Sequence, residues 1–407
     1  MWRNYTGGTV MAGCPGARMA GCPDAPGAAF LRDGSMDNVY VYDLGRLTRI
    51  YQSWRALLPE VAPHYAVKCN PDPQMVKVLA ELGCSFDCAS PAEIAQVLAA
   101  QVPVARIIYA NPCKRPADLA FAAERGVRTT TFDSLCELDK VLAHAPDMAL
   151  VLRIYAHDPG AQCVMSHKYG ATEEEWPAIL ARARQRRANL VGVSFHIGSG
   201  ACNPGAFTTA IEQARKLADL ARDAGFVLSL VDIGGGFTVA NFRTMAVAVR
   251  AALARCFPPG AGVRCISEPG RLFAESIACL YTSVIGVRQR GDVRSVTITD
   301  SIYGSFNCIA NDHALPVPVP LGDAAAAECV PTQLFMESCD GYDAFPRLLS
   351  LPRLQYGDRL LWRNMGAYTV AASSAFNGMD FARPRTLYTW SEADADAETE
   401  TKNETSV

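Results

Sequence analysis

The sequence predicts an α/β protein built on a closed barrel of eight parallel strands, followed by a second domain rich in β-strands. Short β-type runs alternate with helical stretches eight times before residue 270. Alternation of strand and helix implies a parallel sheet, and eight such units imply closure into a barrel with helices outside. No Gly-x-Gly-x-x-Gly follows the first strand, which argues against an open dinucleotide-binding sheet.

The predicted barrel strands are short apolar runs, and the predicted helices are amphipathic. The strands are expected at residues 64–68, 85–88, 106–110, 128–132, 148–156, 189–197, 227–233 and 263–267. Intervening segments such as PQMVKVLAELG carry apolar residues at helical spacing with charge on the other face. Beyond the barrel the chain is β-rich. Its candidate strands are residues 295–300, 359–364 and 367–372.

Composition excludes several classes of protein. The net charge of -3 argues against a nucleic-acid surface, which needs clustered basic charge. No run of about eighteen apolar residues exists, so no membrane span is expected. Fifteen cysteines are scattered through apolar segments without metal-ligand spacing, which predicts reduced, buried thiols in a cytoplasmic protein and no metal site.

The two ends of the chain differ in composition from the rest. Residues 1–36 are rich in Gly, Ala, Pro and Cys and contain the near-repeat MAGCPGA and MAGCPDA, which predicts a disordered leader. Arg3 and Arg18 are few for an organelle transit peptide, although import is the alternative. Residues 391–407 are acidic and poor in apolar residues, which predicts a solvated tail.

Unusual polar residues fall at the ends of the predicted barrel strands. Active sites of such barrels form at the carboxyl ends of the strands. The residues concerned are Lys68, Asp87, Asn111, Arg153, His196, Gly234–Gly236 and Glu268. Each has an ordinary structural explanation alone: a snorkelling lysine, a buried ion pair, a core histidine or a tight turn. Their convergence on one rim favours an active site.

Pyridoxal phosphate is the cofactor that suits these residue types. Backbone N–H groups of Gly234–Gly236 can close on a phosphate, with Arg271 as a charged partner. Lys68 can hold the aldehyde as an imine. Glu268 can keep the pyridine nitrogen protonated, and His196 can lie on the ring face. The residues therefore predict a cofactor-dependent amino-acid enzyme.

Nine motifs in order give the chain a resemblance to a known family. They are HYAVKCN, FDCAS, IIYANPCK, VSFHIGSG, DIGGGF, SEPGR, YGSFN, CDGYD and NMGAYTVAASSAFNG. With these motifs, from about residue 38 to 390, the chain resembles the eukaryotic ornithine decarboxylases of the alanine-racemase-like, barrel-type (fold type III) pyridoxal-phosphate family. The resemblance implies decarboxylation of L-ornithine to putrescine and carbon dioxide, a step of polyamine biosynthesis.

The resemblance implies a role for each matching residue. Lys68 would form the internal imine, His196 would stack on the ring, and Cys339 of a second subunit would protonate Cα. The cofactor-binding residues would be Lys68, Asp87, Arg153, His196, Ser199, Gly234, Gly235, Gly236, Glu268, Arg271 and Tyr368. Asp312, and Asp340 of the second subunit, would bind the distal ammonium of a diamino acid, and Phe376 would line the pocket.

The resemblance also implies a domain order. After the leader, residues 37–43 would form a strand of the β domain, residues 44–273 the cofactor-binding barrel, and residues 274–390 a β-sandwich that this strand completes. The barrel would thus be inserted into the second domain. The expected assembly is a homodimer that shares its active sites, and antizyme is a possible partner at a helix near residues 115–125.

Alternatives to ornithine remain open. Two carboxylates at the far wall would select ornithine or lysine over neutral amino acids. A lysine decarboxylase, one accepting several diamino acids, or an arginine decarboxylase is therefore the alternative. A catalytically silent regulator resembling antizyme inhibitor is another. Retention of Lys68, Asp87, Arg153, Cys339 and Asp340 weighs against silence.

Three segments depart from the family pattern. Thr238 follows Phe237 where these decarboxylases usually have proline. Met336, Glu337 and Ser338 precede Cys339 where Gly-Pro-Thr is usual, and Asn311 replaces a tyrosine before Asp312. Because Glu337 brings an extra carboxylate close in sequence to the proposed proton donor, it is expected to influence substrate choice.

Overall fold

The protein consists of two compact units. The computed structural model describes residues 35–381 and 383–392. One unit is continuous, Thr48–Ala274, and the other combines the chain up to Leu47 with the chain from Glu275 onward. The predicted leader and tail lie almost entirely outside the described residues. No helix in residues 35–381 and 383–392 has the length and apolar character that a membrane crossing requires.

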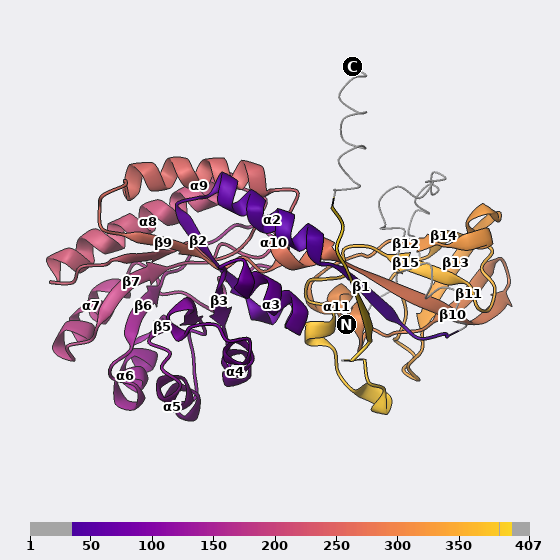
Figure 1. The fold of residues 1–407 in the computed structure, drawn as a ribbon, viewed down its shortest axis with the longest axis horizontal. Coiled ribbons are helices and arrows are strands. Elements are labelled where there is room, and N and C mark those ends of the chain that lie inside the picture. The colour runs from indigo at the N-terminus through magenta and orange to yellow at the C-terminus, as the bar shows by residue number, and fades with distance from the viewer. Residues whose placement is uncertain (1–34, 382, 393–407) are drawn as a thin grey trace, which may run out of the picture. The chain divides into compact units, whose positions relative to one another are not determined.

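The first unit is a closed barrel of eight parallel strands, as the sequence predicts (Figure 1). The strands are β2 (Val61–Ala66), β3 (Ser85–Cys88), β4 (Ile107–Tyr109), β5 (Thr129–Phe132), β6 (Ala149–Arg153), β7 (Leu190–Ser194), β8 (Leu230–Asp232) and β9 (Arg264–Ser267). The ring closes where Val61 of β2 pairs with Cys265 of β9. Each strand overlaps one predicted run, so the fold class is confirmed.

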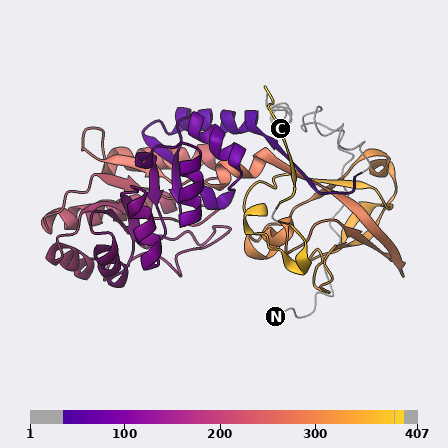
Figure 2. The same cartoon turned by 60° about the horizontal axis from the view of Figure 1, so that its bottom comes forward.

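Helices cover the outside of the barrel. They are α3 (Pro73–Glu81), α4 (Pro91–Ala99), α5 (Pro116–Glu124), α6 (Leu135–His144), α7 (Trp176–Gln185), α8 (Pro204–Asp223) and α9 (Phe242–Cys256). Figure 2 shows this outer layer from a second direction. Side chains of Asp72, Ser90 and Ser134 accept N–H groups at the starts of α3, α4 and α6. These caps satisfy backbone N–H groups that would otherwise be unpaired. The residues next to each helix therefore determine where that helix begins.

The barrel interior and the helix layer are packed by apolar side chains. Ile108, Val151 and Leu230, from β4, β6 and β8, form one buried cluster. Contributions from alternate strands are how such barrels fill their interior in layers. On the outside, Trp54 of α2 (Leu44–Leu57) stacks on Phe242 with ring centroids 5.2 Å apart and meets Phe237 edge-on at 5.3 Å.

The second unit is predominantly β. Its strands are β1 (Val39–Asp43), β10 (Ala278–Arg290), β11 (Val293–Ile298), β12 (Pro318–Pro320), β13 (Cys329–Met336), β14 (Leu349–Pro352), β15 (Arg359–Trp362) and β16 (Arg385–Thr389). The long β10 shifts register between Val284 and Gly286, so its first half pairs with β1 and β15 and its second half with β11. The predicted strand near residue 40 is therefore present as β1 beside β10.

Two strand predictions in the second unit are confirmed and one is wrong. Residues 295–300 and 359–364 overlap β11 and β15. Residues 367–372 instead form a turn and a 3₁₀ segment, Val370–Ala372. Tyr368 has φ of 53°, which no strand residue adopts, and the Thr369 hydroxyl donates to the Met365 carbonyl at 2.6 Å. Local side-chain bonding therefore overrides the β propensity of this segment.

The prediction that the cysteines are buried holds for only some of them. Of the thirteen cysteines in the described part of the chain, six are buried. Five are exposed: Cys113, Cys136, Cys202, Cys329 and Cys339. Apolar sequence neighbours did not distinguish loop and helix-surface positions from strand interiors.

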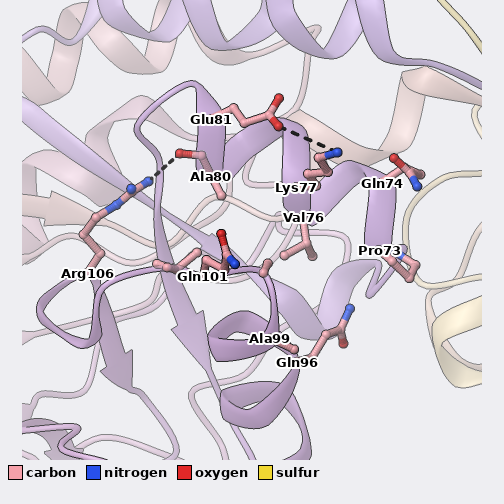
Figure 3. Close-up of a pocket in the computed structure, with 12 residues that line it drawn as sticks. Pro73, Gln74, Val76, Lys77, Ala80, Glu81, Gln96, Ala99, Gln101 and Arg106 are labelled. Carbon is pink, nitrogen blue, oxygen red and sulfur yellow. Dashed lines mark hydrogen bonds and ion pairs between the residues drawn. The ribbon is translucent and has the colours of Figure 1, made fainter.

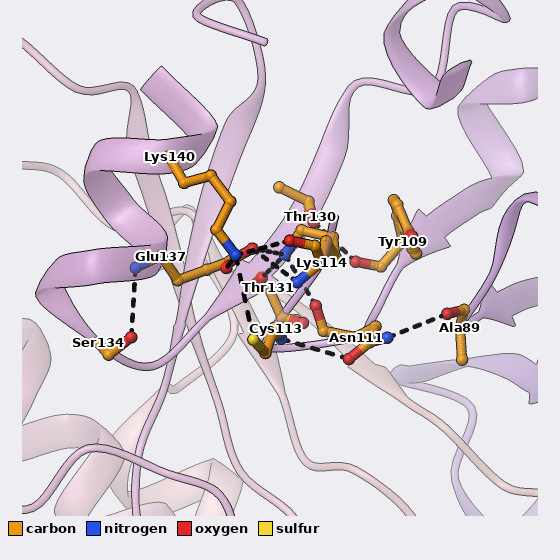
Figure 4. Close-up of polar contacts among 10 residues, drawn as sticks. All are labelled: Ala89, Tyr109, Asn111, Cys113, Lys114, Thr130, Thr131, Ser134, Glu137 and Lys140. Carbon is orange, nitrogen blue, oxygen red and sulfur yellow. Dashed lines mark hydrogen bonds and ion pairs between the residues drawn. The ribbon is translucent and has the colours of Figure 1, made fainter. Parts of the chain in front are cut away.

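A buried ion network fixes the loop after β4 (Figure 4). The Lys114 ammonium donates to the carbonyls of Asn111 at 2.8 Å and Thr131 at 2.7 Å, and lies 2.8 Å from Glu137 Oε1. Lys140 Nζ lies 2.5 Å from Glu137 Oε2. Burial lowers the pKa of Lys114, and the Glu137 carboxylate opposes this effect. The network joins the rim loop to β5 and α6.

Glu137→Gln tests the contribution of this network. The change would leave the buried Lys114 ammonium without its carboxylate, so the free energy of unfolding in urea should fall by about 3 kcal/mol. Glu81→Gln is the matched control, because Glu81 pairs with Lys77 at 4.0 Å on an exposed helix surface. That control should change stability by less than about 0.5 kcal/mol. Equal losses in the two variants would contradict the special role of the buried pair.

Asp300 is a buried carboxyl group in the β unit. Its Oδ1 accepts the N–H groups of Ser301 and Ser305, both at 2.7 Å, and its own N–H donates to Glu337 Oε1 at 2.9 Å. Burial, together with the nearby Glu337 carboxyl, raises the pKa of Asp300 to about 7. Asp300 therefore holds its proton at pH values where an exposed aspartate has lost it.

Asp300→Asn should change how stability depends on pH. Between about pH 4 and pH 7 the folded wild type keeps a proton that the unfolded chain has released, so its stability falls as pH rises through this window. The variant keeps the accepting carbonyl and loses the titration. Its stability relative to wild type, from urea unfolding, should rise by up to about 4 kcal/mol from pH 4 to pH 8. A difference that stays constant across this range would contradict the assignment.

Candidate active site

The predicted barrel residues lie at the carboxyl ends of the strands. Lys68 sits in the 3₁₀ turn Val67–Cys69, directly after β2, rather than on the strand as predicted. Asp87 lies within β3, and Arg153 is the last residue of β6. His196, Gly234–Gly236 and Glu268 follow β7, β8 and β9, and Arg271 begins α10 (Arg271–Ala274). The structure thus places these residues on one rim.

Lys68 is paired with a carboxylate inside the barrel. Its ammonium forms an ion pair with Asp87 Oδ2. The Lys68 side chain is 35% exposed, whereas Asp87 is completely buried. Asp87 Oδ1 has no hydrogen-bond partner among the residues described. Burial raises the pKa of Asp87, and the charges of Lys68 and Arg153 oppose that rise. Lys68 therefore reaches solvent while its charge is held by a fixed internal partner.

His196 presents a neutral ring at the same rim. Its Nδ1 accepts the Gly198 N–H at 3.0 Å, which puts the ring proton on Nε2. Burial, together with the charges of Arg153 and Lys68, lowers the pKa of His196 to about 3. A Cβ added to Gly235 would lie 2.9 Å from His196 Nε2. The glycine loop therefore packs directly against a flat, uncharged ring.

The glycine loop has the properties of an anion-binding turn. Gly234 and Gly236 have φ of 64° and 112°, and a Cβ at Gly234 would lie 2.2 Å from the Phe195 carbonyl oxygen. Gly235 and Gly236 are buried, yet their N–H groups donate no hydrogen bond to any residue in the described ranges. Because buried N–H groups are rarely left unpaired, these two suit an anion.

A buried arginine lies beside a serine near this loop. Arg271 is 4% exposed, and its Nε and Nη2 donate to Ser199 Oγ at 3.3 and 3.2 Å. Ser199 and Cys163 exchange two backbone hydrogen bonds of 3.0 Å, which fix the serine. A buried guanidinium with a hydroxyl group is a suitable partner for a phosphate. The glycine amides, Ser199 and Arg271 therefore fit the phosphate of pyridoxal phosphate.

Two carboxyl groups lie together, that of Asp232 at the end of β8 and that of Glu268 directly after β9. Glu268 Oε1 and Asp232 Oδ2 are buried, and no other residue in the described chain donates a hydrogen bond to either atom. Burial raises the pKa of Glu268 well above its usual range, and the Asp232 charge raises it further. Burial raises the pKa of Asp232 to about 6. A partner with a protonated ring nitrogen suits such a carboxyl group, so Glu268 also fits the cofactor.

Asp232 is a site residue that the sequence analysis missed. Its Oδ1 accepts the Gly234 N–H at 2.9 Å, and the Gly234 carbonyl accepts the Glu268 N–H at 2.8 Å. Asp232 therefore links the glycine loop to Glu268. A carboxylate at the end of a buried strand, two residues before three glycines, was the available signal.

The β unit brings together three of the predicted site residues. Tyr303 stacks on Phe376 with ring centroids 4.1 Å apart, and its hydroxyl donates to Asp340 Oδ2. That hydrogen bond lowers the pKa of Asp340. The exposed Cys339 is hydrogen bonded to Asn377. Tyr303 and Asn377 were not predicted individually, although both lie in motifs that carry the resemblance.

Asp312 and Tyr368 lie on other segments of the β unit. Asp312 follows the short helix α11 (Cys308–Asn311), and its N–H donates to the Cys308 carbonyl at 3.0 Å. It is 5% exposed. Tyr368 has a left-handed backbone, with φ of 53°, which makes the chain turn sharply at this residue. Their proposed substrate and phosphate contacts stay predictions.

Two of the residues that depart from the family pattern, Thr238 and Glu337, form local hydrogen bonds. The Thr238 N–H donates to Asn241 Oδ1 at 2.7 Å, a bond that proline cannot make, and Asn241 N–H donates to Thr238 Oγ1 at 3.1 Å. Asn241 Nδ2 also donates to the Gly236 carbonyl at 3.0 Å. The carboxyl of Glu337 accepts the Asp300 N–H. The third, Asn311, has Nδ2 3.5 Å from Asn307 Oδ1.

A cavity elsewhere on the barrel contains none of these residues. A groove of about 710 Å³ lies between α3 and α4 (Figure 3). Lys77 and Glu81 pair along one side, and Arg106 donates to the Ala80 carbonyl at 3.0 Å. Its remaining lining is mainly alanine, valine and glutamine. This groove on the helix layer is separate from the rim that carries the candidate site.

Comparison with known proteins agrees with the rim chemistry. The family model for the pyridoxal binding domain of pyridoxal-dependent decarboxylases matches residues 44–275. The chain is 43% identical over 352 residues to the chloroplastic ornithine decarboxylase of Nicotiana glauca, covering 84% of this chain and 81% of that protein. The predicted resemblance and the predicted cofactor, pyridoxal phosphate, are confirmed.

Solved structures of related enzymes have the same fold. The arginine decarboxylase of Paramecium bursaria Chlorella virus superimposes with a TM-score of 0.85 at 35% identity, covering 89% of this chain and 98% of that chain. A lysine/ornithine decarboxylase from Vibrio vulnificus, complexed with putrescine, gives 0.80 at 30% identity, covering 89% and 96%. In sequence, fold and cofactor chemistry, the chain belongs to the pyridoxal-dependent decarboxylases.

Proposed function

We propose that this protein converts L-ornithine to putrescine and carbon dioxide. The carrying observation is the arrangement of the barrel rim, where Lys68 pairs with Asp87 and Gly235 packs against both the His196 ring and the Glu268 carbonyl. An amine, a flat neutral ring and a buried carboxyl group thus share one small region. Identity of 43% to an ornithine decarboxylase supports ornithine as the substrate.

The barrel residues have distinct tasks toward the cofactor. When bound, pyridoxal phosphate supplies an electron sink for the negative charge that loss of carbon dioxide leaves at Cα. Lys68 provides the amine that anchors it covalently, and His196 supports its ring face. Glu268 holds a proton at the ring nitrogen. The phosphate-binding residues in this proposal are Ser199, Gly234, Gly235, Gly236, Arg271 and Tyr368.

Asp87 and Arg153 are the charged residues that act on the Lys68 ammonium. Asp87 holds the Lys68 ammonium until the cofactor arrives, because a buried carboxylate needs a cation. Arg153 opposes the rise in the pKa of Asp87 and stacks over the Tyr169 ring at 5.1 Å. Together they favour a defined orientation of the Lys68 amine at the rim.

The β unit of a second copy would supply the proton donor and part of the substrate pocket. Cys339 would deliver a proton to Cα after carbon dioxide leaves. Asp340 accepts the Tyr303 hydroxyl, and its lowered pKa keeps it a carboxylate at neutral pH, which suits the distal ammonium of a diamino acid. Asp312 would share that ammonium, and Phe376 would line the pocket. The proposal therefore requires a homodimer.

Other diamino acids are the alternative substrates. The related solved structures include an arginine decarboxylase and a lysine/ornithine decarboxylase. Retention of Asp312 favours ornithine over the longer arginine, whereas Asn311 in place of tyrosine changes the residue beside it. A cytoplasmic location and antizyme binding at helix α5 also belong to this proposal. A chloroplast location, as in the name of the Nicotiana relative, is the alternative.

An assay of amine products tests the proposed substrate. Purified protein loaded with pyridoxal phosphate should form putrescine from ornithine with kcat/KM at least about tenfold above that for cadaverine from lysine or agmatine from arginine. The amines are separated and quantified by chromatography with the three substrates side by side. Preferential formation of agmatine or cadaverine would replace the proposed substrate, and no amine from any of them would favour a regulatory protein.

Mixed dimers test whether the active site is shared. Lys68→Ala and Cys339→Ala should each be severely impaired alone, because each lacks one half of the chemistry. In a heterodimer, one site would combine an intact Lys68 with an intact Cys339, so roughly a quarter of wild-type activity should return in a statistical mixture. Isolated heterodimers that remain inactive would show that Lys68 and Cys339 do not act across subunits.

A further inference from the structure

A closed circuit of contacts in the β unit surrounds Cys339. The Cys339 N–H donates to Asn377 Oδ1 at 3.1 Å, and Asn377 Nδ2 donates to Cys339 Sγ at 3.2 Å. Asn377 follows Phe376, which stacks on Tyr303, and the Tyr303 hydroxyl donates to Asp340, the residue after Cys339. Each member of the circuit is therefore held by two neighbours.

The backbone conformation of Asn377 suits this position. Asn377 has φ of 58° inside the 3₁₀ turn Phe376–Gly378. Asparagine adopts this left-handed conformation more readily than most residues with a side chain. Glycine would also adopt it, but has no amide to reach Cys339. The Ser374 N–H further anchors the turn by donating to the Tyr303 carbonyl at 2.8 Å.

The direction of the two hydrogen bonds determines what the cysteine can do. Because the Cys339 N–H needs an acceptor, the Asn377 amide must turn its oxygen toward the backbone and its NH₂ group toward the sulfur. The sulfur therefore accepts a hydrogen bond, and its own S–H bond points away from the amide. The thiol hydrogen is left available for transfer to another atom.

We infer that Asn377 is a positioning residue that sets the orientation of the Cys339 thiol for proton delivery to Cα. The inference rests on the proposed function, in which Cys339 supplies that proton. Side chains on exposed loops sample several rotamers, so a donor that must reach one carbon needs such a restraint. Asn377 supplies it from 38 residues away in sequence.

Misplaced protonation gives a product that can be measured. If the proton goes to the cofactor carbon instead of Cα, hydrolysis by one water molecule releases 4-aminobutanal and leaves the substrate nitrogen on the cofactor as an amine. No external oxidant is needed, because the cofactor aldehyde is reduced to an amine while the substrate amine becomes an aldehyde. The ratio of aldehyde to putrescine per carbon dioxide released therefore reports where the proton goes.

Three variants separate the hydrogen bonds from general effects. Asn377→Ala removes both bonds. Asn377→Asp keeps the oxygen that accepts the Cys339 N–H but replaces the donor to sulfur. Asn364→Ala is the matched control, because Asn364 is also an exposed residue of the same unit with a left-handed backbone, with φ of 57°. Replacing it imposes the same kind of backbone strain away from Cys339.

Amide exchange and product ratio are measured on the holoenzyme, and exchange also on the cofactor-free protein. Asn377→Ala should speed exchange of the Cys339 amide at least about fivefold, and Asn377→Asp should leave it protected. Both should raise the aldehyde fraction about tenfold or more while carbon dioxide release stays within about threefold of wild type. The Asn364→Ala control should change neither readout.

The outcomes separate this inference from the proposed function. Faster exchange in Asn377→Ala with putrescine as the sole product would overturn the positioning role and leave ornithine decarboxylation intact. An equal aldehyde fraction in the Asn364→Ala control would also overturn it, since strain alone would then suffice. If the wild type forms no diamine, the proposed function fails and the inference fails with it.

Discussion

The ion pair between Lys68 and Asp87 is the constraint on which the rim depends. Asp87 is completely buried in β3, where a carboxylate without a cation would be strongly unfavourable. The parallel register that pairs Ala66 of β2 with Asp87 places the turn containing Lys68 next to it. The barrel ladder therefore fixes the position of the Lys68 amine.

That pair also sets the charge of its surroundings. Burial, together with the positive charges of Arg153 and Lys68, keeps His196 neutral, so the ring at this rim is flat and uncharged. Asp232 and Glu268 place two carboxyl groups close together in a buried space. Burial raises the pKa of both groups, which favours a proton shared by the pair. The rim thus combines two cations, Lys68 and Arg153, with two acids, Asp232 and Glu268, whose protonation depends on the ligand that is bound.

Parts of this arrangement follow from the sequence, and parts do not. The eight strands were predictable because buried parallel strands are continuous apolar runs, and a polar residue at the end of such a run stands out. Lys68, Asp87 and Glu268 were found in this way. Asp232 was missed because the expected strand ran on to Ile233, which put the carboxylate inside an apolar run and not at its end. Asn377 was missed because its partner is distant in sequence. Neither contact has a local periodic pattern.

The two units hold their functional residues by different means. In the barrel, strand ladders and buried aromatic packing fix the rim, and Phe237 anchors the glycine loop between Trp54 and Phe207. In the β unit, the loop with Cys339 is exposed and is held by side-chain bonds to other loops. Substitutions near this loop can therefore alter the surroundings of Cys339 without disturbing the strands and aromatic packing that fix the barrel rim.

The departures from the family pattern illustrate this separation. Thr238 uses its N–H to bind Asn241, which in turn holds the Gly236 carbonyl, so the exit of the glycine loop remains fixed without proline. Glu337 directs a carboxyl oxygen to the Asp300 backbone. That hydrogen bond ties the extra carboxyl group to the backbone of the β unit, just as the Thr238 bond stays within the barrel. Each departure is therefore accommodated inside the unit that contains it.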